Sequence, residues 1–177
     1  MHKRAFGLIE LMIVVIILAV LVAITLPVMA DMATTYRGRA EIQNSHDVLL
    51  KTTTESLARG LRSQVVVSDS SIIGQIIERD GTLTQVAQYN LDFGSFGRTS
   101  NLATPWLREN ETDLTNFGGA NHTLSFNAFG TLALAPGDPA GAVILFSYGD
   151  YSASIEILPS GLIDVFHHQK GEDSWVQ

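Results

Sequence analysis

Twenty residues near the N-terminus, Leu11 to Ala30, carry no charged side chain, and only Thr25 and Pro27 interrupt their apolar character. At a rise of about 1.5 Å per residue, a helix of this length matches the roughly 30 Å hydrocarbon core of a bilayer. The segment therefore predicts one transmembrane helix. Basic side chains occupy positions 2–4, so the positive-inside rule predicts that they stay in the cytoplasm and that the chain crosses the membrane from Asp31 onward.

One acidic side chain, Glu10, lies just before this apolar run. A charged group inside lipid is costly and usually marks a function, so a plain single-pass anchor does not explain it. A cleaved secretory signal predicts a shorter apolar region, no acid at its head and a cleavage site between small residues. Neither of these two interpretations accounts for Glu10.

The stretch "FGLIELMIVV", which starts at Phe6, resembles the processing and methylation motif of type IV prepilins and pseudopilins. Members of that family have a short basic leader, a cut by a dedicated membrane peptidase, and then a Phe-x-Leu-Ile-Glu stretch that opens a long apolar helix. The resemblance covers residues 1–30. The chain departs from the family pattern at Ala5, where Gly is usual, and at Gly7, where Thr is usual.

Two cleavage positions compete because of this departure. A cut after Gly7 would make Glu10 the third residue of the mature chain. A cut after Ala5 makes Phe6 the first residue and Glu10 the fifth, as in the family, and it puts Pro27 twenty-second, where similar pilins have a helix-breaking proline. We therefore predict a cut between Ala5 and Phe6, and the resemblance implies that the new amine of Phe6 is N-methylated.

The resemblance also implies an assembly role for Glu10 and Phe6, which are four residues apart on one helix face. In a filament of axially staggered helices, Glu10 of one subunit can pair with the Phe6 amine of a neighbour. A buried charge pair adds little stability, but it can set the axial register of neighbouring subunits, because either charge would be costly to bury without its partner. Pro27 is predicted to kink or open the helix between Ala23 and Pro27, unless the helix simply ends at the membrane surface.

Residues 31–62 predict a continuation of the helix, because they contain no proline and end in a basic turn. An apolar stripe, which we expect to pack on a sheet, consists of Leu50, Thr54, Leu57 and Leu61, extended by Tyr36, Ala40 and Gln43.

The remaining chain predicts strands separated by turns. The strand-like segments are residues 64–69, 82–88, 122–130, 131–136, 141–149, 151–158 and 162–168. Turn signals are Asp80-Gly81, Gly118-Gly119, residues 136–139, Gly149-Asp150 and residues 159–161. The last three strands predict an antiparallel meander. Residues 71–81 are ambiguous between strand and helix, and residues 94–120 predict a long surface loop.

These elements predict an α+β, pilin-like fold in which a long N-terminal helix, its first half transmembrane, packs on a C-terminal antiparallel β-sheet or sandwich. The expected divisions are a cleaved leader (1–5), a transmembrane helix (6–30), a periplasmic half-helix (31–62) and a β-rich domain (63–177). Residues 124–134 and 142–166 resemble the end of minor pseudopilins of the GspH/FimT kind.

Other function classes find little support. The chain has no cysteine and a net charge of −7, without the clustered bases that nucleic acid binding requires. No catalytic motif is present, so we expect neither an enzyme nor a cofactor. His167 and His168 are neighbours in a predicted strand and would point to opposite faces, so we expect no metal site. The sequons at Asn110 and Asn121 are interpreted as ordinary loop and strand residues.

We therefore expect a structural subunit of a type IV filament, with a minor pseudopilin of type II secretion or a related pilus favoured. The resemblance implies three kinds of partner: other pilins or pseudopilins, the prepilin peptidase, and an inner-membrane assembly platform. It also implies a single-pass protein of the bacterial inner membrane with its C-terminal domain in the periplasm, and entry into a filament. The alternative is a pilus-tip adhesin or DNA-uptake pilin that binds a ligand through its β-domain.

Overall fold

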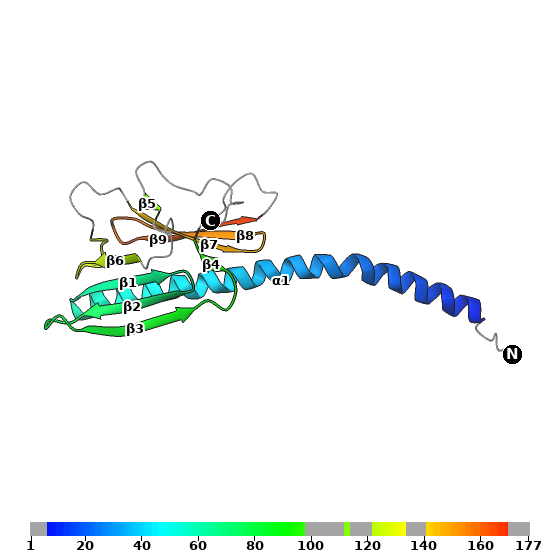
Figure 1. The fold of residues 1–177 in the computed structure, drawn as a ribbon, viewed down its shortest axis with the longest axis horizontal. Helices are drawn as coiled ribbons and strands as arrows, with labels where there is room; N and C mark the ends of the chain where they lie inside the picture. Colours follow the sequence, from blue (N-terminus) through cyan, green and yellow to red (C-terminus); the bar gives the residue numbers. More distant parts are fainter. Residues whose placement is uncertain (1–6, 98–111, 114–121, 134–140, 170–177) are drawn as a thin grey trace.

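The computed structural model describes residues 7–97, 112–113, 122–133 and 141–169. One long helix, α1 (Leu8–Arg59), comes first, and every strand follows it in the chain. The N-terminal half of α1 projects away from the strands, whereas its C-terminal half lies among them (Figure 1). This arrangement is the predicted α+β, pilin-like one.

Two sheets flank the C-terminal half of the helix. The first has the strand order β3-β2-β1-β6 and is antiparallel throughout; its strands are β1 (Arg62–Ser68), β2 (Ser71–Ile77), β3 (Leu83–Asn90) and β6 (His122–Phe126). The second has the order β4-β7-β8-β9, with β5 paired in parallel to β7; its strands are β4 (Ser95–Phe96), β5 (Thr112–Asp113), β7 (Ala142–Tyr148), β8 (Tyr151–Ile157) and β9 (Ile163–Gln169).

The predicted meander of the last three strands is confirmed, since β7, β8 and β9 pair antiparallel in chain order. The ambiguous segment 71–81 is a strand, β2, followed by the Asp80-Gly81 turn. The predicted loop 94–120 holds the two short strands β4 and β5 among its described residues. The turn signals at Gly118-Gly119 and 136–139 lie outside the described residues.

The strand predicted over 131–136 is wrong in its described part. Leu132 forms only an isolated bridge to Phe126, and its N–H donates to the Pro159 carbonyl at 3.1 Å instead of entering a ladder. The preceding turn explains this, because the Asn127 side chain accepts the N–H groups of Phe129 and Thr131 at 2.9 and 3.2 Å. Such side-chain bonds favour a turn over strand pairing.

The helix ends at Arg59, three residues before the predicted end at Arg62. Gly60 adopts a left-handed conformation with φ 62°, and the Leu61 N–H donates to the Ser56 carbonyl at 3.1 Å. Glycine is the residue that most readily takes this conformation at the end of a helix.

The prediction that the leucine stripe packs on a sheet is wrong. Leu50 and Leu57 are 42% and 58% exposed. The buried face of α1 consists instead of Gly38, Glu41, Ile42, Ser45, Val48, Leu49, Thr52 and Ser56. Half of these residues are glycine, serine or threonine, and their small size lets the sheets approach the helix closely.

Two glycines show how close this approach is. A Cβ added at Gly74 of β2 would overlap the Thr52 side chain, and one added at Gly38 of α1 would overlap the Tyr151 ring. The Thr52 and Tyr151 side chains therefore leave no room for a larger residue at either position. The buried helix face is chosen by shape as well as by hydrophobicity.

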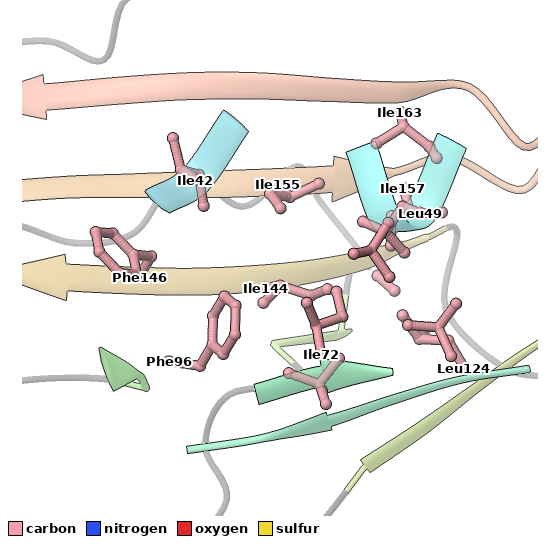
Figure 2. Close-up of a cluster of buried hydrophobic side chains, with 14 of the residues drawn as sticks. Ile42, Leu49, Ile72, Phe96, Leu124, Ile144, Phe146, Ile155, Ile157 and Ile163 are labelled. Atoms are coloured by element: carbon pink, nitrogen blue, oxygen red, sulfur yellow. The ribbon is translucent and has the colours of Figure 1, made fainter. Parts of the chain in front are cut away.

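One hydrophobic core joins the helix to both sheets (Figure 2). The helix contributes Ile42 and Leu49, and the sheets contribute Ile72, Phe96, Leu124, Ile144, Phe146, Ile155, Ile157 and Ile163. Full burial of an aliphatic side chain is worth about 1.5–3 kcal/mol. This packing fixes the direction in which the free half of α1 leaves the domain.

Candidate processing and assembly site

The N-terminal half of α1 is long and apolar enough to cross a membrane. Its most apolar window has a mean hydropathy of 3.2, and none of that window is buried against the described chain. Apolar side chains from Leu8 to Met32 are exposed on every side of the helix. A helix that is apolar all round belongs in lipid or among other helices.

Glu10 lies in the first turn of this helix. Its Oε2 atom accepts the Gly7 N–H at 3.0 Å, a hydrogen bond that the sequence did not indicate. The carboxylate thus caps a backbone donor at the positive end of the helix dipole. A backbone N–H does not neutralise a charge, and within the described part of the chain Glu10 forms no ion pair.

The residues of the predicted cut, Ala5 and Phe6, lie outside the described residues. Cleavage there, methylation of Phe6 and pairing of its amine with Glu10 stay predictions. Helix α1 runs through Pro27 without interruption (Figure 1), so the alternative that the helix ends at the membrane surface is wrong. The kink or opening of the helix near Pro27 stays a prediction.

His167 takes part in a hydrogen bond of the second sheet. The Tyr151 hydroxyl lies 2.6 Å from its Nδ1 atom. Burial, followed by the nearby Arg39 charge, holds the pKa of His167 below its usual value, and burial raises the pKa of Tyr151. A neutral imidazole can therefore accept the tyrosine proton in a hydrogen bond. Among the described residues no group of three or more His, Asp or Glu side chains could hold a metal, and Asn110 and Asn121 lie outside them.

Sequence reasoning missed Glu41, which is only 3% exposed although it is charged. Its Oε1 atom accepts the N–H groups of Asp92 and Phe93, each at 3.2 Å. The carboxylate therefore ties the connection between β3 and β4 to α1. No local pattern indicates this, because the partners are more than fifty residues apart in the chain.

A free apolar helix that begins with an acid, followed by mainly antiparallel sheets around its other half, is a pilin-like arrangement. Residues 1–26 match the family described as the prokaryotic N-terminal methylation motif. The N-terminus of the chain thus resembles that of type IV prepilins: it carries the signature of prepilin-peptidase processing and begins a helix suited to anchor the chain in a membrane. No curated protein and no solved structure matches the chain significantly.

Proposed function

We propose that this chain is a non-enzymatic structural subunit of a type IV filament, a minor pseudopilin or pilin of the GspH/FimT kind that serves type II secretion. One observation carries the proposal: behind a methylation motif, half of a long helix is apolar on all sides and packs on nothing in the described chain. Its partners are other pilins or pseudopilins, the prepilin peptidase and an inner-membrane assembly platform. The domain stands in the periplasm until the subunit enters the filament.

The exposed stripe of α1 supports association with other helices. Val22, Met29, Tyr36, Leu50 and Leu57 are all exposed and lie at multiples of seven residues from one another. Such spacing keeps side chains on one side of a helix that packs along a second one. The stripe therefore extends the exposed apolar surface of the free half of α1 along the domain, with an interruption at the exposed Gln43.

Replacing Leu57 with Glu should leave the fold intact and weaken the association of the chain with other prepilins. Leu57 is 58% exposed, and substitutions at such sites usually change stability by about 0.5 kcal/mol or less. Cross-linking in membranes measures the association. The Leu83→Glu variant is a matched control, because Leu83 is 51% exposed but lies on β3. Equal cross-linking of the two variants would show that the stripe is not an interface.

Processing is tested by mass spectrometry of protein extracted from membranes. The mature chain should start at Phe6, with added mass that corresponds to N-methylation. A strain without the prepilin peptidase should yield only the uncleaved chain. If Leu8 were the first residue, the cut would follow Gly7 and the register of Glu10 would be wrong.

The machine that the subunit serves is tested by deleting its gene. Secretion function predicts that exported proteins accumulate in the periplasm, while surface pili remain. Loss of pili with normal secretion would assign the subunit to a pilus instead.

A further inference from the structure

Three segments meet at the end of the domain that faces the free half of α1 (Figure 1). They are the helix around Arg37, the connection between β3 and β4, and the turn between β7 and β8. The Arg37 guanidinium carbon lies 5.0 Å from the centroid of the Phe93 ring, and the Phe93 and Tyr148 ring centroids are 5.7 Å apart. The membrane-proximal rim is our name for the following residues in or beside these three segments: Tyr36, Arg37, Arg39, Asp92, Phe93, Tyr148 and Asp150.

The rim lies a short distance beyond the apolar run, which ends at Ala30. At about 1.5 Å per residue, Arg37 is roughly 10 Å further along the helix axis. The polar headgroup layer adds about 5–8 Å on each side of a hydrocarbon core of roughly 30 Å. When the apolar run spans a bilayer, the Arg37 backbone therefore lies about 2–5 Å outside the headgroup layer, a gap that its long side chain can bridge.

The chemistry of the rim suits that position. Tyr36 and Phe93 are 69% and 40% exposed, and aromatic side chains are enriched at the interface between lipid and water. Arg37 and Arg39 are exposed and can reach phosphate oxygens through their long side chains. Carboxylates of both flanking segments are also present, on Asp92 and Asp150. A surface with both signs of charge matches a headgroup that carries a phosphate and an ammonium group.

Glu41 makes the rim a fixed surface. By accepting the N–H groups of Asp92 and Phe93, its buried carboxylate holds the β3–β4 connection against α1. Phe93 is thereby kept over Arg37 and beside Tyr148. The aromatic and charged groups therefore keep one orientation relative to the helix that would carry them to the membrane.

We propose that the membrane-proximal rim is a docking surface for zwitterionic phospholipid headgroups, which seats the domain on the bilayer while α1 is in the membrane. The proposal depends on the membrane insertion of α1 and not on the filament role. Binding of the rim to the headgroups limits how far the domain tilts around the point where the helix leaves the lipid.

The chain has no cysteine, so single cysteines can be labelled cleanly. Full-length Tyr36→Cys, Asp92→Cys and Leu83→Cys variants are spin-labelled and reconstituted in vesicles of phosphatidylcholine and phosphatidylethanolamine. Collisions with a water-soluble nickel chelate are then measured. Labels at positions 36 and 92 should collide several-fold less often than the label at position 83, which is exposed at the far end of β3. Equal collision rates at all three positions would overturn the proposal.

The collision experiment is extended by two comparisons, one between Glu41 variants and one between lipid compositions. Glu41→Ala should raise the collision rate of a label at position 92 towards that at position 83, whereas Glu41→Gln, which keeps an oxygen acceptor, should not. Protection should persist in vesicles without anionic lipid. If protection appeared only in vesicles with anionic lipid, the rim would bind negative charge and the assignment to zwitterionic headgroups would be wrong.

Discussion

Replacement of Glu10 by Leu should leave membrane insertion and cleavage intact and lower the incorporation of the chain into a filament at least tenfold. The substitution removes an acid from an apolar helix, so insertion is not impaired. It also removes the anionic partner of a neighbour's Phe6 amine. Breaking one half of a buried pair costs about 3–5 kcal/mol, against at most about 1 kcal/mol for an exposed pair. The larger cost applies in the interior of a filament.

The Glu10→Gln variant separates two roles of this side chain. An amide oxygen can still accept the Gly7 N–H that Glu10 accepts at 3.0 Å, but it carries no charge. Both variants are compared by cross-linking to the other prepilins, beside a blot for cleavage. Charge pairing predicts that Gln fails as Leu does. Normal association of the Gln variant would show that capping of the helix, and not a charge pair, is what assembly needs.

Replacement of Gly74 by Ala should destabilise the domain by about 1–3 kcal/mol, the usual cost of overpacking a core. The added Cβ would overlap the Thr52 side chain, so either α1 or β2 must shift. For a chain of this size, the melting temperature should fall by about 2–12 °C. Thermal unfolding of the full-length protein in detergent, followed by circular dichroism, measures the change.

A second substitution tests whether this contact is the cause. Thr52→Ala alone removes a hydrogen bond from its hydroxyl to the Val48 carbonyl at 2.7 Å, which is worth about 1 kcal/mol. In the Gly74→Ala background it also removes Oγ1, the atom with the severest overlap, and Cγ2. The double variant should therefore be more stable than the sum of the two single changes predicts. Additive effects would contradict the close approach of α1 to β2.

Several features of this chain could be predicted from local sequence. The apolar run and the Phe-Gly-Leu-Ile-Glu stretch carry their information in neighbouring residues, and the family match over residues 1–26 agrees with the resemblance. The strands β7, β8 and β9 were predicted because alternating or β-branched runs and short turns are also local. Hydrophobic period and turn chemistry act over a few residues, so these elements do not depend on the rest of the fold.

Only the tertiary structure decided which face of α1 is buried. By hydrophobicity alone Leu50 and Leu57 belong inside, yet the sheets pack on a face with Gly38 and Thr52, where small side chains let the backbones approach. Two other contacts join residues far apart in the chain. They are the parallel pairing of β5 with β7 and the hydrogen bond of Glu41 to the β3–β4 connection. Shape complementarity and long-range hydrogen bonds depend on two surfaces at once. They therefore cannot be predicted from the local sequence of either surface alone.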